Sequence, residues 1–452
     1  MIVPDSTEVF EKILVVGLGV SGRAVCTLLR GRGADVTGTD IRERAVFNGA
    51  LDGLEAAGCS LSLGGHRSED FTKADRIIVS PGIPLDIAPL VEARRRGTEI
   101  IGELEWAWLQ VDLPVVAVTG TNGKTTTTAL IGKMIELSGK KPFVGGNIGT
   151  PLSEWLLAGE RADILVLEVS SFQLDTAPRF RPDAGVLLNI TEDHLDRYES
   201  FETYSDSKLS VFRNQNAEQY AVVNGDDPLC GRRISEIPGQ VLTFGSDHSA
   251  NARVVGNAIR VEVPGREAFD LDLAKARLKG AHNRENIMAA SLAAVAMGVS
   301  PEAIRLAVES FGGFAHRVEW VGQWRGIDFY DDSKGTNVGA VVKALEGFDR
   351  PVVLLLGGRD KLGSYEPLAR ALKSNGKAAI AYGEAGPGIF DQLRGGLPAR
   401  CLPDLEAAFA EAISRAQPGD VVLLSPACSS FDQYESYAKR GDHFKRLVAE
   451  LK

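Results

Sequence analysis

The sequence predicts an α/β protein of three domains, and three observations lead to this prediction. The chain has 452 residues, and about 150 residues per domain is usual. Short runs of β-branched residues alternate with helical patterns, which is typical of parallel sheets with crossover helices. Glycine-rich turns follow short apolar strands at residues 17–22 and again at 120–126. The second turn indicates that a new nucleotide-binding domain starts near residues 104–114.

The composition is that of an ordinary soluble globular chain, with 44% hydrophobic and 24% charged residues. Disordered, collagen-like and fibrous proteins are excluded. The 50 basic and 60 acidic residues give a net charge of −10, so we expect no nucleic-acid partner, and anionic ligands must be met by local basic groups. Five cysteines without CxxC spacing argue against a disulfide framework or a zinc site. The apolar runs are too short to cross a bilayer, and we expect a cytoplasmic protein without membrane insertion.

Residues 1–104 are expected to form a Rossmann-like domain, with strands near 13–16, 36–40 and 77–79. Gly17-Leu18-Gly19-Val20-Ser21-Gly22 lies between a strand and a helix, and Asp40 ends the next strand 18 residues after Gly22. This is the spacing of the dinucleotide fingerprint, in which a carboxylate binds a ribose hydroxyl. Taken alone it predicts NAD. The same physics suits any nucleoside diphosphate.

Residues 105–313 are expected to form a P-loop domain of the ATPase type. Gly120-Thr121-Asn122-Gly123-Lys124-Thr125-Thr126 follows the apolar strand 115–119. Glycines let the backbone amides approach a polyphosphate, a lysine binds the β- and γ-phosphates, and a hydroxyl binds Mg²⁺. The strict motif would place glycine where Val118 stands, so this loop is a variant.

Two further strand ends in this domain carry polar groups that suit a metal site. Glu168 ends the apolar run 164–167, and a P-loop needs an acidic group on a neighbouring strand. His194 lies in the polar cluster 189–196 after the run 186–188; it could be a metal ligand or a loop cap. We expect residues 240–244, 253–255 and 258–263 to form a small antiparallel sheet attached to the main sheet, with a hairpin turn at Gly256-Asn257.

Residues 314–452 are expected to form a second Rossmann-like domain. We expect strands at 352–356, 378–382 and 421–424, and helices at 405–416 and 444–451. We place a hinge at Gly312-Gly313, because paired glycines leave the backbone freest there.

The motifs together resemble those of one family across nearly the whole chain. TGTNGKTT, a strand ending in Glu followed by Ser-Ser, NITEDHLDR, HNxxN, AHRVE, DDSKGTN and SPACSSFDQ are similar to motifs of the Mur ligases of peptidoglycan synthesis. The resemblance is strongest to members that join D-glutamate to UDP-N-acetylmuramoyl-L-alanine. It implies an ATP-dependent amide ligase that works through an acyl phosphate, as a monomer.

For ATP and metal, the resemblance implies roles that the residues alone do not establish. Taken alone, Lys208 is a solvated helix cation, Asn147 a turn residue, and Asn283 with Asn286 a helix N-cap pair. The family resemblance implies two Mg²⁺ ions, the first held by Thr125 and Glu168, the second by His194. It also implies a carbamylated Lys208, whose carbamate oxygens can bind metal as an ammonium cannot. The implied set for ATP and catalysis comprises Gly120, Thr121, Asn122, Gly123, Lys124, Thr125, Thr126, Glu168, His194, Lys208, Asn283, Arg317 and Asp332.

For the other substrates, the resemblance implies two further groups of residues. The UDP-sugar group is Val20, Ser21, Asp40, Arg42, Gly82, Asn147 and Ser170, and Gly22 then serves helix–strand packing. The D-glutamate group is Lys334, Thr336, Ser430 and Phe431. No DNPR motif, which marks the diaminopimelate-adding relatives, occurs near Gly357-Gly358-Arg359-Asp360-Lys361, and Tyr437 stands where the glutamate-adding members have Phe.

Three alternatives remain open from the sequence. One is a different Mur ligase or a folylpolyglutamate-type synthetase, although the extra N-terminal nucleotide domain disfavours the latter. The second is an NAD-dependent oxidoreductase with a regulatory ATPase domain, but His66 is the only histidine in the first domain. The third is a nucleotide-gated binding module without turnover, which the joint presence of Lys124, Glu168, His194 and Lys208 disfavours.

Overall fold

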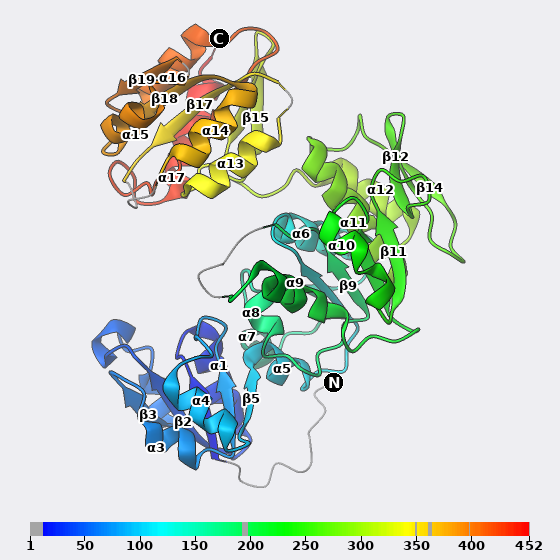
Figure 1. Cartoon of the computed structure of the whole chain (residues 1–452), viewed down its shortest axis with the longest axis vertical. Coiled ribbons are helices and arrows are strands. Elements are labelled where there is room, and N and C mark those ends of the chain that lie inside the picture. The colour runs from blue at the N-terminus through cyan, green and yellow to red at the C-terminus, as the bar shows by residue number, and fades with distance from the viewer. Residues whose placement is uncertain (1–11, 192–197, 349, 360–363, 397, 452) are drawn as a thin grey trace. The chain divides into compact units, whose positions relative to one another are not determined.

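A computed structural model describes residues 12–191, 198–348, 350–359, 364–396 and 398–451 (Figure 1). The chain divides into two compact units, each described here by itself. The first unit holds residues up to Ala276 together with Glu285–Ser310, and the second holds Arg277–Arg284 and the chain from Phe311 onward. The division therefore falls once inside helix α11 (Ala281–Ala296) and once directly after helix α12 (Pro301–Ser310).

The first part of unit 1 is a parallel five-stranded sheet of order β3-β2-β1-β4-β5. The order in which the strands are added reverses at β1, since β2 and β3 lie on one side of it and β4 and β5 on the other. In open α/β sheets, ligands bind at the carboxyl ends of the strands at such a point. The elements are β1 (Lys12–Val16), α1 (Val20–Gly31), β2 (Asp35–Asp40), α2 (Asp52–Ala56), β3 (Ser60–Leu63), α3 (Ser68–Lys73), β4 (Arg76–Val79), α4 (Ala88–Arg95), β5 (Glu99–Gly102) and α5 (Glu103–Trp108).

The second part of unit 1 is built on a nine-stranded sheet of order β14-β13-β12-β11-β10-β9-β6-β8-β7. Strand β6 runs parallel between β8 and β9, so the turns after these three strands meet at one edge. Besides α11 and α12, the elements are β6 (Val115–Thr119), α6 (Lys124–Leu137), β7 (Pro142–Gly146), α7 (Leu152–Ala158), β8 (Ile164–Glu168), α8 (Ser171–Leu174), β9 (Ala184–Leu187), α9 (Phe201–Leu209), β10 (Tyr220–Asn224), α10 (Pro228–Arg232), β11 (Gln240–Phe244), β12 (Ala252–Val255), β13 (Ala258–Val261) and β14 (Phe269–Asp272).

The antiparallel appendage differs from the sequence-based expectation in one strand. The hairpin of β12 and β13 across Gly256-Asn257 is present, with Val255 opposite Ala258. Residues 240–244 are not part of the antiparallel sheet, because β11 pairs in parallel with β10 in the main sheet. The third antiparallel strand is β14. Its alternation of buried Phe269 and Leu271 with exposed aspartates is a period-2 signal that could have identified it.

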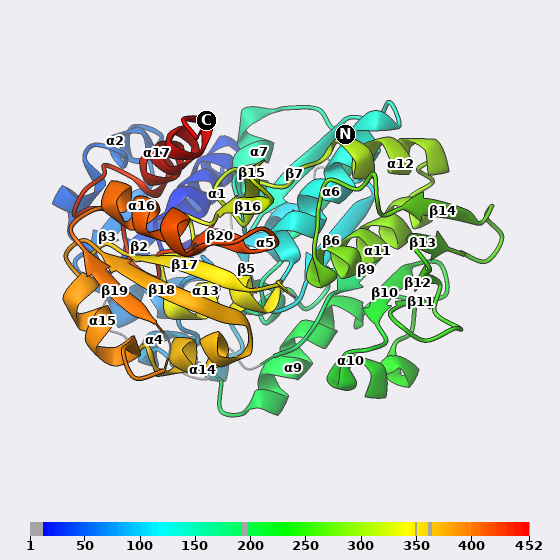
Figure 2. The same ribbon diagram turned by 90° about the horizontal axis from the view of Figure 1, so that it is seen from above.

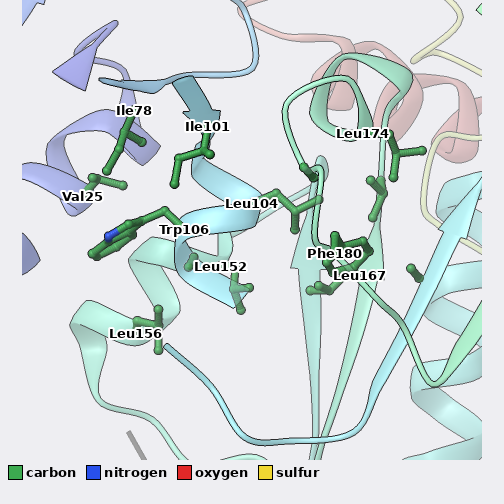
Figure 3. Packing of buried hydrophobic residues seen from close by; sticks show 14 of the residues in the cluster. Val25, Ile78, Ile101, Leu104, Trp106, Leu152, Leu156, Leu167, Leu174 and Phe180 are labelled. Atoms are coloured by element: carbon green, nitrogen blue, oxygen red, sulfur yellow. The ribbon is translucent and has the colours of Figure 1, made fainter. Parts of the chain in front are cut away.

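The two sheets of unit 1 share one hydrophobic core at helix α5. Figure 3 shows Trp106 and Leu104 of α5 near Val25 and Ile78 on one side and Leu152 and Leu156 on the other. All of these side chains are almost fully buried. Burying a large aromatic or aliphatic side chain contributes about 1.5–3 kcal/mol, so α5 joins the two sheets through packing.

Unit 2 is a six-stranded sheet of order β15-β16-β20-β17-β18-β19 with helices on both faces (Figure 2). Side chains of β17 alternate between α13, α14 and α15 on one face and α16 and α17 on the other. Only β15 is antiparallel, pairing with β16. The elements are β15 (Glu319–Trp324), β16 (Ile327–Asp331), α13 (Val338–Glu346), β17 (Val352–Gly357), α14 (Glu366–Asn375), β18 (Gly376–Tyr382), α15 (Gly386–Leu393), β19 (Ala399–Leu402), α16 (Leu405–Arg415), β20 (Val421–Leu424) and α17 (Tyr437–Ala449).

The predicted α/β class with two Rossmann-like parts and a central P-loop part is confirmed. Helix α17 begins at Tyr437, seven residues before the expected start, because Ser436 caps it by accepting a hydrogen bond from the amide of Lys439. The predicted boundaries near 104 and 313 and the hinge at Gly312-Gly313 stay predictions. In the part of the chain that the structure describes, no helix is both long and apolar enough to span a membrane.

Candidate functional site

The loop at residues 120–123 owes its shape to two glycines between β6 and α6. Gly120 and Gly123 have φ of 144° and 84°, a region that favours glycine. A Cβ on Gly123 would lie 2.3 Å from Oδ1 of Asn286, and one on Gly120 would lie 3.0 Å from the Cβ of Leu188. The loop therefore packs closely and leads into the N-terminus of α6, where backbone amides and the helix dipole favour an anion.

Two lysines from different helices meet at this loop. Nζ of Lys124 donates to the carbonyls of Gly120 and Thr121, each at 2.9 Å. Nζ of Lys208 on α9 donates to the same Gly120 carbonyl at 2.9 Å and lies 4.6 Å from the ring centre of Tyr204. Lys208 is only 2% exposed, so it is not the solvated cation that its sequence context suggests. Two ammonium groups beside a glycine-rich loop suit a polyphosphate.

Glu168 at the end of β8 receives hydrogen bonds from two neutral groups. The Thr125 hydroxyl donates to Oε2 at 2.8 Å, and the Asn147 amide donates to Oε1 at 3.0 Å. Glu168 is buried, and no ion pair to it is found among the described residues. A buried carboxylate beside a hydroxyl, with no cation to neutralise it, is an oxygen donor set that fits Mg²⁺. His194, the other expected metal ligand, lies outside the described residues.

Asn189, just after β9, holds the phosphate loop by two hydrogen bonds, a role that its sequence context does not predict. Its Oδ1 accepts from the amide of Asn122 at 2.8 Å, and its carbonyl accepts from the amide of Thr121 at 2.9 Å. The Thr121 hydroxyl is also 3.2 Å from the hydroxyl of Tyr204. The available signals were the position of Asn189 at a strand end and of Tyr204 one helical turn before Lys208.

At the N-terminal fingerprint, Asp40 is fully engaged by protein groups. Its oxygens accept from the backbone amides of Leu18 and Arg42, and from Nε and Nη2 of Arg42 at 2.9 and 2.7 Å. Burial opposes ionisation of Asp40, but the hydrogen bonds and charge of Arg42 outweigh it and lower its pKa to about 2. The Arg42 guanidinium lies 4.5 Å from the ring centre of Phe47, and the Arg42 side chain is half-exposed. Asp40 therefore fixes the direction of a cation at this edge.

The other fingerprint residues lie at the same strand ends. Val20 and Ser21 begin α1, and Gly82 lies exposed in the turn after β4. A Cβ on Gly22 would lie 1.9 Å from the carbonyl oxygen of Gly17. The expectation that Gly22 serves close helix–strand packing is therefore confirmed.

In unit 2, the expected binding residues gather at the carboxyl ends of β16 and β20. Lys334 and Thr336 follow β16, and Ser430 and Phe431 follow β20. Nζ of Lys334 is 5.5 Å from the ring centre of Tyr437, whose ring meets that of His316 edge-on. Ser430 is buried, whereas Phe431 is exposed. This edge offers a cation and an aromatic rim to a small ligand.

Asp332, also at this edge, is a buried carboxyl without a close cation partner. It accepts from the Ser425 hydroxyl at 2.6 Å and from the amide of Val318 at 3.3 Å. Burial raises its pKa to about 7, against the lowering effects of these hydrogen bonds and of the Arg317 charge. The Arg317 guanidinium lies 5.9 Å from the ring centre of Phe314.

Family models match all three parts of the chain. They are "Mur ligase MurD-like, N-terminal domain" over residues 11–102, "Mur ligase middle domain" over 118–294, and "Mur ligase, glutamate ligase domain" over 316–428. The chain is 45% identical over 442 residues to the UDP-N-acetylmuramoylalanine--D-glutamate ligase of Geotalea daltonii, with 98% of each chain covered. It is also 45% identical to the enzyme of that name from Desulfosudis oleivorans, covering 99% of this chain and 98% of the other.

The chain belongs to the Mur ligase family. Solved structures agree at the level of fold. The UDP-N-acetylmuramate-alanine ligase MurC of Thermotoga maritima matches with a TM-score of 0.56 at 21% identity, covering 98% of this chain and 100% of that one. A pseudomurein peptide ligase type C from Methanothermus fervidus matches with a TM-score of 0.57 at 19% identity and the same coverage. As a Mur ligase, the chain is an ATP-dependent ligase.

Within this Mur ligase chain, the structure brings most of the expected residues into three groups. The loop 120–126, Asn147, Glu168 and Lys208 form one group, and the fingerprint residues form another, both in unit 1. Arg317, Asp332 and the four expected glutamate-binding residues lie in unit 2. Ser170, two residues after Glu168, caps α8, since its hydroxyl accepts a hydrogen bond from the backbone amide of Gln173.

The two asparagines of the HNxxN motif are not a helix N-cap pair, because α11 begins at Ala281 and contains both. Asn286 points toward the phosphate loop, where its Oδ1 accepts from the Thr127 hydroxyl at 3.2 Å. Asn283 donates to the carbonyl of Lys279 at 2.8 Å and belongs to unit 2. Their spacing of three residues placed them on one helix face, yet they contact different units.

Proposed function

We propose that this chain adds D-glutamate to UDP-N-acetylmuramoyl-L-alanine with ATP, through an acyl phosphate, in peptidoglycan synthesis. The observation that carries the proposal is the 45% identity over nearly the full length to relatives that bear this activity in their names. The site geometry supports the chemistry, since two lysines donate to the carbonyl of Gly120 in the phosphate loop and the carboxylate of Glu168 accepts from Thr125, the second residue of the helix after that loop.

In this proposal, ATP occupies the loop 120–126 with its phosphates at Lys124. Thr125 and Glu168 would hold one Mg²⁺, and His194 with Lys208 would hold a second once Lys208 is carbamylated. The metal would offset the repulsion between the γ-phosphate and the substrate carboxylate. Asn283, Arg317 and Asp332 would complete the ATP site.

The UDP-sugar would bind at the fingerprint, with its diphosphate beside Arg42. Asp40 does not have oxygens free for a ribose hydroxyl, because each already accepts two hydrogen bonds. This arrangement disfavours the NAD-dependent oxidoreductase that the fingerprint alone suggests. The monomeric state and the cytoplasmic location stay predictions.

One assay tests the proposed activity directly. The purified chain receives ATP, Mg²⁺ and UDP-N-acetylmuramoyl-L-alanine, with D-glutamate, L-glutamate, D-glutamine or diaminopimelate in turn, and phosphate release is followed. We expect release that requires both the UDP-sugar and D-glutamate. Equal release without either acceptor identifies a plain ATPase, and preference for another amino acid identifies a different Mur ligase. Lys124→Ala should abolish turnover, because it removes the cation beside the transferred phosphate.

A further inference from the structure

Arg440 in the second turn of α17 is the largest charged side chain that the fold buries completely. Its exposed fraction is 0%, and no carboxylate pairs with it among the residues that the structure describes. Its partners are backbone carbonyls. Nη2 donates to Ser333 at 2.9 Å and to Cys428 at 3.0 Å, and Nη1 donates to Gly357 at 3.3 Å. Nε has no hydrogen-bond partner.

These three carbonyls belong to the turns after three adjacent strands. Ser333 follows β16, Cys428 follows β20, and Gly357 ends β17, and these strands are neighbours in the order β16-β20-β17. Because a guanidinium is planar and presents its donors in a fixed fork, it can hold three turns at set positions. The backbone is built closely around it, since a Cβ on Gly358 would lie 3.0 Å from Nη1 of Arg440.

Two of these turns carry side chains that are expected to bind the amino acid. Lys334 follows Ser333 directly, and Ser430 and Phe431 lie two and three residues after Cys428. The neighbouring Gly441 also packs tightly, because a Cβ there would lie 2.4 Å from Oδ2 of Asp331 and 2.2 Å from Nδ1 of His316. The start of α17 thus packs directly against the loops that carry these side chains.

The charge of Arg440 has a second consequence. An arginine side chain is protonated in all protein environments, and a low dielectric around a buried charge lets that charge act over several ångströms. Lys334 adds a second cation at the same edge. A ligand that carries an additional carboxylate is therefore favoured over one that carries an amide at that position.

We propose that Arg440 is a positioning residue for the amino-acid site, which holds the three strand-end turns together and biases the site toward a diacid. This inference rests on the proposed function. It goes beyond it by assigning the preference for glutamate over glutamine partly to a residue that does not touch the amino acid.

The test compares Arg440→Gln with Arg446→Gln, a matched change at an exposed arginine on the same helix. In the phosphate-release assay we expect Arg440→Gln to raise the KM for D-glutamate at least 10-fold and to reduce the preference for D-glutamate over D-glutamine at least 5-fold. The KM values for ATP and the UDP-sugar should stay within twofold of wild type. Arg446→Gln should leave all three KM values and the preference unchanged.

Arg440→Lys keeps the positive charge but lacks the planar set of donors that a guanidinium presents. This variant also provides a test if Arg440→Gln does not fold. We expect it to retain the preference for D-glutamate over D-glutamine while its KM for D-glutamate still rises several-fold. A KM for D-glutamate within twofold of wild type in the folded variants, or an equal rise of all three KM values, would overturn the inference. Failure of the proposed function is distinct, because wild type itself would then show no D-glutamate-dependent release.

Discussion

Asp40 and Asp332 occupy similar places in the two Rossmann-like parts of the chain, yet their environments shift their pKa values in opposite directions. Asp40 ends β2 and Asp332 follows β16, and both are buried. Arg42 holds the pKa of Asp40 at about 2, whereas burial beside Ser425 raises the pKa of Asp332 to about 7. A strand-end carboxylate is therefore not defined by its position. The balance between burial and the hydrogen-bonded or charged groups nearby determines whether it is an anchored anion or an acid that is half protonated near neutral pH.

Glu168 is a third case, and it explains why this carboxylate suits a metal. Its partners are a hydroxyl and an amide, which orient the carboxylate without adding positive charge. Asp40 already has a cation, whereas burial raises the pKa of Asp332 although the Ser425 hydroxyl donates to it. The three residues predict three different responses to removal of the charge.

The largest effect is expected for Glu168→Gln. Loss of the charge removes the anionic oxygen that would hold Mg²⁺ beside Thr125, and we expect turnover to fall at least about 1,000-fold, which corresponds to about 4 kcal/mol. Phosphate release is measured over a range of Mg²⁺ concentrations. Glu160→Gln, at an exposed glutamate of the same part of the chain, serves as the control. Turnover of Glu168→Gln within 10-fold of wild type would refute a metal role for Glu168.

A pH-dependent gain in stability is expected for Asp332→Asn. The folded chain binds a proton at Asp332 that the unfolded chain releases near its ordinary pKa of 3.8. The contribution of this group to stability therefore falls as pH rises from about 4 to 7 and stays at its lowest above 7, by at most about 4 kcal/mol.

Thermal unfolding of the nucleotide-free protein measures this effect. Asp332→Asn should have the midpoint of wild type at pH 4 and a higher midpoint at pH 8. Asp391→Asn, at an exposed carboxylate paired with Arg394, should show no such trend. An Asp332→Asn midpoint that is lower than wild type at pH 8 would contradict the raised pKa.

The fold and the phosphate loop could be predicted from the sequence because local patterns encode them. Glycines at 120 and 123 and the apolar strand before them specify the loop without distant contacts. The partners of several buried polar groups could not be predicted, because they lie far along the chain. Ser425 is 93 residues from Asp332 and Lys208 is 88 residues from Gly120. Arg440 lies outside the helix predicted at 444–451, and no local pattern marks it, because its three carbonyl partners come from three separate turns.

The opposite pH trend is expected for Asp40→Asn. Because the folded pKa lies below the ordinary value of 3.8, Asp40 adds stability above about pH 4, which is lost as pH falls toward 2. The contribution is at most about 2 kcal/mol. Relative to wild type, Asp40→Asn should lower the midpoint at pH 7 and lose most of that difference near pH 2.5.

Binding of the UDP-sugar provides a second measurement for Asp40. The Arg42 side chain donates two hydrogen bonds to Asp40, and Asp40→Asn removes the charge and one of the two acceptor oxygens. Arg42 is then held less firmly in one direction, and we expect the KM for the UDP-sugar to rise about 10-fold. Asp35→Asn lies at an exposed position at the start of the same strand and should change neither quantity. An unchanged KM would mean that the direction of Arg42 does not matter for the UDP-sugar.

The smallest effect is expected for Tyr437→Phe, which tests whether the rim of the unit 2 site depends on a hydrogen bond or on a ring. The ring of Tyr437 contacts His316 and lies near Nζ of Lys334, and its side chain is partly exposed. A cation interacts with the face of either Tyr or Phe, so the KM for D-glutamate should change less than twofold in Tyr437→Phe. Tyr437→Ala, which removes the ring, should raise that KM about 5-fold. If Tyr437→Phe raises the KM as much as Tyr437→Ala, the hydroxyl itself binds the amino acid. The Tyr437 side chain would then act through a hydrogen bond, as the groups around Asp40 and Asp332 do, and not through its ring.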